Sequence, residues 1–215
     1  MARTSTGAPG KRLTREDKRE ANRARILQAA RKVFGRRGYH GATIEEIADE
    51  SGLSNGAVYY NFANKEDLFL ALLEDWRGEL IRGVEIAFAS GDRRAGAPEE
   101  QLREEVRRIL KSLGPSRDWQ LLLLEFVTYA ARNQRFRTRF VAGRQRFKTA
   151  LTDALEQRIA ALGLEPAVPP ERLTLLLVAL VNGLAVDQLT EPGALPDELL
   201  GNALVALMQP AGRRR

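Results

Sequence analysis

The sequence contains no cysteine and only one histidine, His40. The lack of cysteine excludes disulfide bonds, thiolate metal sites and a cysteine nucleophile. A single histidine cannot supply an HExxH motif, and the sequence contains neither a Ser–His–acid set nor a phosphate-binding loop. We therefore predict that the chain is not an enzyme, and we expect no catalytic residues, no metal site and no cofactor.

Long apolar runs are also missing from the sequence. The longest uninterrupted run extends from Leu175 to Val181, far short of the roughly 20 residues that span a bilayer. Residues 1–17 lack the apolar segment of a signal peptide. These absences predict a cytoplasmic protein with no membrane partner.

Positive charge is concentrated at one end of the 215-residue chain, whose net charge is +6. The first 65 residues hold 13 Lys/Arg against 7 Asp/Glu, whereas the remaining 150 residues hold 21 of each. Such one-sided charge indicates a polyanionic partner such as nucleic acid. Residues 1–13 are expected to form a disordered basic arm, which either contacts DNA or only keeps the chain soluble. Residues 211–215 are expected to form a disordered tail.

A first helix is predicted over residues 14–37. Thr14 can cap it, with Asp17 as the reciprocal acid three residues later. Apolar residues then recur at the spacing of one buried helical face. Gly38 stands where a glycine commonly ends a helix.

Residues 41–65 predict two short helices joined by a tight turn. Thr43 and Glu46 form a capping box for the first helix. Gly52 occupies the turn, where a left-handed backbone is accessible to glycine. Ser54 caps the second helix.

The second short helix, from Asn55 to Asn61, is too short to be stable alone and has a largely polar outer face. The major groove of DNA admits an α-helix whose N-terminal residues reach the base edges. The small residues Gly56 and Ala57 would allow close approach. The tyrosines that follow can contact phosphates or bases, although one of them can instead be half-buried in the core.

This stretch resembles the signature of TetR-family transcriptional regulators. The residues that carry the resemblance are Thr43, Ile47-Ala48, Ser51-Gly52-Leu53-Ser54-Asn55-Gly56-Ala57-Val58-Tyr59-Tyr60-Asn61-Phe62, Lys65 and Leu68. With the first helix, it covers about a quarter of the chain. The resemblance implies a homodimeric repressor whose C-terminal domain binds a small molecule and thereby releases a palindromic DNA operator.

The resemblance also implies roles for individual residues. The phosphate contacts would be Thr43, Tyr59, Asn61 and Lys65, and the residues against bases would be Asn55, Gly56, Ala57 and Tyr60. Many family members have histidine at the position of Asn61, and asparagine can still hydrogen-bond a phosphate. Glu45, at a position where some members contact DNA, either reads a cytosine amine or faces solvent.

We predict an all-α fold of about nine helices. A helix-turn-helix DNA-binding domain would occupy residues 14–64, and a helical ligand-binding and dimerisation domain residues 65–210. The helices expected in the second domain are one beginning after the cap Asn64, and others at residues 98–113, 116–132, 133–162, 171–190 and 196–208, with a stiff connector at 166–170.

Residues 116–132 are apolar on most sides, as in a central buried helix, yet they include Glu125. This carboxylate either lines a ligand pocket or pairs with an arginine of the next helix. The candidate pocket residues are Trp76, Phe88, Trp119, Leu123, Glu125, Phe126, Tyr129, Phe140 and Phe147. They would bind a small hydrophobic or amphipathic effector. If they pack solidly instead, the chain is a DNA-binding adaptor controlled by a protein partner.

The last two predicted helices are apolar on more than one face, so one face can pack on the domain and the other on a second copy. Two helices from each copy would form a four-helix bundle with two-fold symmetry. A two-fold dimer also suits a palindromic operator. The alternative is that both helices only complete the core of one chain. The candidate interface residues are Leu173, Leu176, Leu177, Leu180, Val181, Leu184, Leu200, Leu204 and Leu207.

Overall fold

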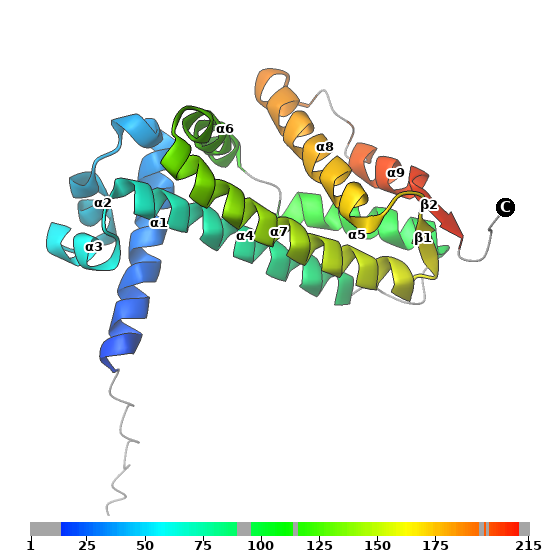
Figure 1. Ribbon diagram of the computed structural model, residues 1–215, viewed down its shortest axis with the longest axis horizontal. Helices are drawn as coiled ribbons and strands as arrows, with labels where there is room; N and C mark the ends of the chain where they lie inside the picture. Colours follow the sequence, from blue (N-terminus) through cyan, green and yellow to red (C-terminus); the bar gives the residue numbers. More distant parts are fainter. Residues whose placement is uncertain (1–13, 90–95, 114–115, 194–195, 197, 211–215) are drawn as a thin grey trace, which may run out of the picture. The chain divides into compact units, whose positions relative to one another are not determined.

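The computed structural model of the protein describes residues 14–89, 96–113, 116–193, 196 and 198–210 (Figure 1). The expected arm, residues 1–13, and the expected tail, residues 211–215, lie outside the described residues. Within the described ranges the fold is all-α, as predicted, with nine helices and one pair of short strands. The elements are α1 (Arg15–Gly41), α2 (Ile44–Ser51), α3 (Asn55–Asn61), α4 (Lys65–Ala89), α5 (Pro98–Leu113), α6 (Arg117–Arg132), α7 (Gln134–Ala161), β1 (Leu164–Pro166), α8 (Pro170–Thr190), α9 (Leu199–Ala206) and β2 (Met208–Pro210).

The chain divides into two compact units, which we call the N-terminal unit (Met1–Phe69) and the C-terminal unit (Leu70–Arg215). Helix α4 begins in the first unit and continues into the second.

The N-terminal unit is built around the buried face of α1. Ile26, Val33 and Phe34 are almost fully buried, as the apolar spacing of the sequence predicted. Phe34 packs edge-on against Phe69 of α4, with ring centroids 5.1 Å apart. The capping box of Thr14 and Asp17 is present at the start of α1. Gly38 leaves helical geometry with φ +69°, so α1 is kinked where the sequence predicted its end.

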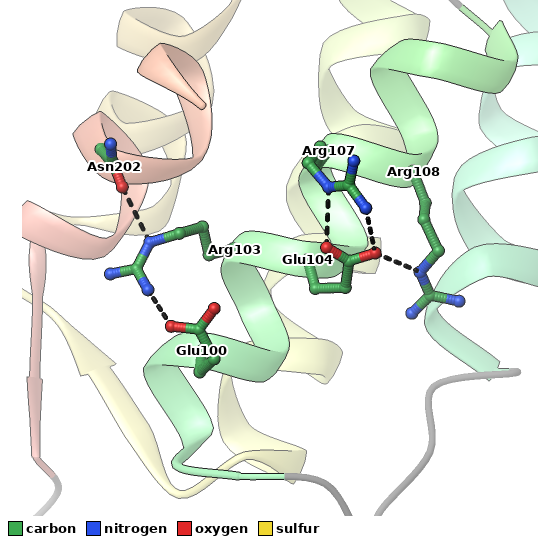
Figure 2. Close-up of polar contacts among 6 residues, drawn as sticks. All are labelled: Glu100, Arg103, Glu104, Arg107, Arg108 and Asn202. Carbon is green, nitrogen blue, oxygen red and sulfur yellow. Dashed lines mark hydrogen bonds and ion pairs between the residues drawn. The ribbon is translucent and has the colours of Figure 1, made fainter. Parts of the chain in front are cut away.

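The C-terminal unit has a core formed by α5, α7, α8, α9 and β1. Helix α5 and helix α9 lie in close contact, because Gly201 of α9 faces the backbone of Arg103 and leaves no space for a Cβ there. Figure 2 shows the polar contacts of this region: the Nε of Arg103 donates to the Oδ1 of Asn202 across 2.8 Å. The core residues are Leu102, Val106, Leu155, Ile159, Leu164, Leu173, Leu177, Leu200 and Leu204.

A buried ion pair crosses this core. Arg158 of α7 donates two hydrogen bonds to the carboxylate of Glu105 on α5, and both residues are at least nine-tenths buried. A buried charge is tolerated only when it is paired and hydrogen-bonded. Next to it, the hydroxyl of Thr152 donates to that of Thr174 across 2.8 Å and joins α7 to α8.

The structure differs from the sequence prediction at the C-terminal end. The last helix, predicted over residues 196–208, comprises only Leu199–Ala206, and Met208–Pro210 pair as an antiparallel strand with Leu164–Pro166. Strands of three residues are too short to show alternating apolar and polar residues. Residues 196–208 were therefore interpreted as one helix.

We predict that Glu105→Gln lowers the free energy of unfolding of the C-terminal unit by about 3 kcal/mol, because it leaves the Arg158 guanidinium buried without its counter-ion. Both tryptophans, Trp76 and Trp119, belong to this unit, so tryptophan fluorescence during urea unfolding reports on it. The control is Glu104→Gln, which removes a half-exposed partner of Arg107 and should cost less than about 1 kcal/mol. Equal effects of the two substitutions would contradict the prediction.

Candidate DNA-binding surface and ligand cavity

Helix α2 is held against α1 by ion pairs. Its carboxylate Glu50 accepts from Lys32 at 3.1 Å and from Arg36 at 2.8 Å, and Glu46 pairs with Arg37 at 3.2 Å. The hydrogen bonds from Arg36 and then Lys32 hold the pKa of Glu50 below its ordinary value. Each of these three α1 cations therefore already has a carboxylate partner within the unit.

The turn between α2 and α3 has the geometry that the sequence predicted. Gly52 has φ +64°, in the left-handed region, and its N–H donates to carbonyl oxygens at the end of α2. Arg25 of α1 adds a hydrogen bond that the sequence did not predict. Its Nη2 donates to the carbonyl of Ser51 across 2.8 Å. The turn is thus fixed both by backbone geometry and by α1.

Helix α3 has very little buried surface. Ser54 caps it by accepting from the N–H of Ala57, and Val58 is its only buried residue. Tyr59 and Tyr60 are 52% and 75% exposed. The structure therefore presents most of this short helix to a partner rather than to the core.

Other residues that the sequence assigned to DNA contact differ in their accessibility. Asn55 and Gly56 are exposed at the first turn of α3. Thr43 is exposed, and its oxygen accepts from the N–H of Glu46, which leaves the hydroxyl hydrogen available to a phosphate. Asn61 is partly buried, and its Nδ2 donates to the carbonyl of Ala57, so a phosphate contact would require this amide to turn.

Lys65 has an internal role that the sequence analysis did not predict. Its ammonium donates to the carbonyls of Tyr39 at 2.8 Å and Ala42 at 2.9 Å, and it lies 4.7 Å from the centroid of the Tyr39 ring. The side chain therefore clamps the loop between α1 and α2 to the start of α4. Two of its three donors are used in this clamp, which limits what it can offer to a phosphate.

The cations that are available for a polyanion lie at the N-terminal end of α1. Arg15, Lys18 and Arg19 are exposed, and among the described residues none of them forms an ion pair. Their spacing places them on one side of the helix. One turn further, the guanidinium of Arg23 lies 4.6 Å from the ring of Phe62, which ends α3. Arg23 of α1 thus contacts the residue that follows the exposed helix α3.

The C-terminal unit contains a cavity of about 230 Å³ that is partly open to solvent. Of the nine residues predicted to line a pocket, Trp76, Phe88, Leu123, Phe140 and Phe147 do so. Glu125 and Tyr129 are partly buried but are not part of the lining, and Trp119 and Phe126 are buried in the packing beside it.

Two of the residues that sequence reasoning missed are charged. Arg77 of α4 and Arg144 of α7 line the cavity, although the sequence gave no reason to separate them from the many solvated arginines. The pKa of Arg77 is lowered to about 10, mainly by burial; Glu74 opposes the shift, and the neighbouring Arg144 and Arg146 add to it.

Helix α8 has an exposed apolar face. Leu175, Leu176 and Val186 are between 41% and 52% exposed. By length and composition, α8 is the one helix in the described ranges that could cross a membrane, and only 17% of that stretch is buried. An apolar face of this kind also suits a helix that packs against another protein chain.

The candidate interface residues are divided between this face and the core. Within a single chain, Leu173, Leu177, Leu200 and Leu204 are buried, and Leu180, Val181, Leu184 and Leu207 are partly buried. Leu176, at 49% exposure, is the candidate with the most surface left for a second copy.

Two protein families match the chain. The family described as "Bacterial regulatory proteins, tetR family" matches residues 26–72, which include α2, α3 and the turn. The family described as "BetI-type transcriptional repressor, C-terminal" matches residues 98–207.

Individual proteins are similar over most of the chain. The repressor AcnR of Corynebacterium diphtheriae is 30% identical over 162 residues, which are 75% of this chain and 77% of that protein. The regulator FadR of Bacillus subtilis in complex with stearoyl-CoA has a TM-score of 0.65 at 18% identity, covering 86% of this chain and 96% of FadR. A regulator of Saccharomonospora viridis in complex with choline has a TM-score of 0.59 at 24% identity, covering 86% and 94% of the two chains. The two structural similarities show the shared fold.

We predict that Gly56→Ala weakens DNA binding without weakening the fold. The nearest atom to an added Cβ is the Oγ of Ser54 at 3.8 Å, an ordinary contact, and alanine favours a helix by up to about 1 kcal/mol. A methyl group between α3 and the bases should cost about 1–3 kcal/mol of overpacking in the complex. Fluorescence anisotropy with DNA from upstream of the gene would measure the affinity, and urea unfolding the stability.

The matched control is Gly78→Ala in α4, where the nearest atom is the flexible end of Arg82. This variant should bind DNA as the unmodified protein does. If Gly56→Ala keeps full DNA affinity, α3 does not approach the bases at this residue.

Proposed function

Because the chain belongs to the TetR family of bacterial transcriptional regulators, we propose that it is a homodimeric repressor released from a palindromic operator by a small molecule. The observation that carries this proposal is the exposure of α3, a helix of seven residues with one buried side chain, in the same unit as Arg15, Lys18 and Arg19, which form no ion pair within the described part of the chain. The exposure of this short helix is explained if a DNA groove covers it in the complex. The DNA lies in the cytoplasm, which is therefore the proposed location.

In the proposed complex, α3 enters the major groove. Tyr60, Asn55 and Gly56 lie against bases, and Tyr59 and Thr43 donate to phosphates. Arg15, Lys18 and Arg19 supply electrostatic attraction to the backbone, because Arg25, Lys32 and Arg36 contact the turn and α2. Asn61 joins the phosphate contacts once its amide turns outward, and Lys65 mainly positions the loop.

The proposed dimer forms through the exposed face of α8. Two copies related by two-fold symmetry cover each other's Leu175, Leu176 and Val186, which are among the largest exposed apolar side chains of the described residues. The same symmetry presents two copies of α3 to two half-sites of a palindrome, about 34–36 Å apart or a multiple of that spacing.

The proposed effector binds in the cavity of the C-terminal unit. Two proteins with this fold have been solved in complex with a small molecule, stearoyl-CoA and choline, which supports a ligand-binding role for this chain. The ligand acts by population shift: it binds better to a form whose recognition helices no longer match the two half-sites. By linkage, the affinity lost for DNA equals the affinity gained for the ligand.

A DNA-binding adaptor controlled by a protein partner is the alternative. The cavity favours a small-molecule effector, because small molecules bind in concave, mostly apolar cavities, and an adaptor that binds a protein partner does not need one. Titrating operator-bound protein with candidate small molecules in a gel-shift assay tests the two. Release by a small molecule supports the repressor, whereas release only by a cell protein supports the adaptor.

We predict that Lys18→Gln lowers the salt dependence of DNA binding. Each phosphate contact contributes about 0.9 to the slope of log K against log salt, so two copies should lose about 1.8. The matched control is Arg172→Gln, which removes one exposed cation from α8 of the C-terminal unit and should leave the slope unchanged. Equal slopes for all three proteins would remove Lys18 from the proposed surface.

We predict that Leu176→Asp converts the dimer into a monomer, because burying a pair of unpaired carboxylates at a two-fold interface costs several kcal/mol. Sedimentation equilibrium would measure the mass at micromolar concentration. The control is Leu121→Asp on α6, another exposed leucine, at 38%. A dimeric Leu176→Asp variant would rule out this face as the interface.

A further inference from the structure

The lining of the cavity has an unusual charge distribution. Twenty of its 23 residues are apolar, and the other three are Arg77, Arg144 and Asn182. No carboxylate contributes to the lining. Any charge within the cavity is therefore positive.

The two arginines lie at the same level of the unit, on neighbouring helices. The guanidinium of Arg77 lies 5.1 Å from the ring of Phe140, one turn before Arg144 on α7. The ends of two α4 side chains fill the space beside Gly143 of α7, so a Cβ there would lie 1.7 Å from the Oε1 of Glu74 and 2.9 Å from the Nη1 of Arg77. Gly143 therefore creates the space in which this charged cluster forms.

The cluster has more positive than negative charge. Glu74 pairs with Arg77 at 3.3 Å and with Arg146 at 3.2 Å, so one carboxylate serves two cations. Among the described residues, Arg144 forms no ion pair. Arg77 is 7% exposed, and water can screen its charge only weakly. A further anion at this position would balance the positive charge that Glu74 alone does not balance.

Apart from Asn182, the remainder of the cavity lining is apolar. Along α4, Val84 and Phe88 follow Arg77, and the distance from Arg77 to Phe88 is about 16 Å at 1.5 Å per residue. Leu151 and Leu155 follow Arg144 on α7 in the same way. The cavity thus has one cationic end and a long apolar body.

We propose that the ligand of this cavity is an amphipathic anion. Its charged group pairs with Arg77 and Arg144, and its apolar body lies along Val84, Phe88 and Leu151. A cationic ligand would be repelled by both arginines, and the ring face of Phe140 is already covered by the guanidinium of Arg77. This proposal rests on the ligand-responsive function proposed above and adds the chemical class of the effector.

The test uses three ligands with the same ten-carbon tail: decanoate, 1-decanol and decyltrimethylammonium. Each displaces the neutral fluorescent compound N-phenyl-1-naphthylamine from the full-length protein. We expect decanoate to displace it at a concentration at least tenfold lower than decanol, and the cation to be the weakest. A preference for decanol or the cation, or no preference, overturns the proposal while leaving a ligand cavity in place. If the fluorescent compound itself fails to bind, both the ligand-responsive function and this inference fail.

Substitutions then assign the anion to the arginines. Arg144→Gln should reduce the preference for decanoate over decanol towards one, with decanol itself unchanged. Glu74→Gln should strengthen decanoate binding at least threefold, since Arg77 loses its competing carboxylate. The matched control is Arg137→Gln, an exposed arginine of the same helix outside the cavity, which should alter neither ligand. An unchanged preference in both Arg144→Gln and Glu74→Gln overturns the assignment.

Discussion

The clamp formed by the ammonium of Lys65 is the interaction on which the proposed DNA surface depends. It holds the carbonyls of Tyr39 and Ala42, which lie between the kink of α1 and the start of α2, to the first residue of α4. Helix α4 also supplies Arg77 to the cavity, twelve residues after Lys65 in the sequence. The residue that fixes the loop before α2 and a residue of the cavity therefore belong to the same helix.

The basic charge of α1 serves two purposes, and the sequence alone does not separate them. Arg25, Lys32 and Arg36 stabilise the turn and α2 through contacts of 2.8–3.1 Å. The cations left for DNA are at the N-terminal turns, beside the end of α3. Positive charge inside the unit thus positions a recognition helix that carries no charge of its own, and sequence reading is left to hydrogen bonding and close approach.

Local sequence signals predicted where the first three helices begin, but they could not predict long-range contacts. Caps at Thr14, Thr43 and Ser54 begin helices where they were expected, because each cap satisfies backbone groups within three residues. Lys65 contacts a carbonyl 26 residues away, which no local pattern can indicate. The pocket arginines were missed for the same reason: Arg144 belongs to an arginine-rich helix, and only the packing of α4 against α7 distinguishes it. The strands β1 and β2 were not predicted, because three residues are too few to show the alternation of apolar and polar side chains that marks a strand.

The uncompensated arginines also bear on how a ligand could change the state of the protein. Binding that gains only from apolar burial depends on buried area alone, so it favours two forms with similar cavities almost equally and shifts their populations little. A charged contact depends steeply on distance and burial, and it therefore distinguishes forms in which α4 and α7 differ slightly in position. Arg77 remains protonated at neutral pH even though its pKa is lowered to about 10, and it shares Glu74 with Arg146, so part of the cost of its charge persists until a further anion pairs with it. The charge at the end of the cavity, more than its apolar volume, can therefore provide the differential affinity that release from DNA requires.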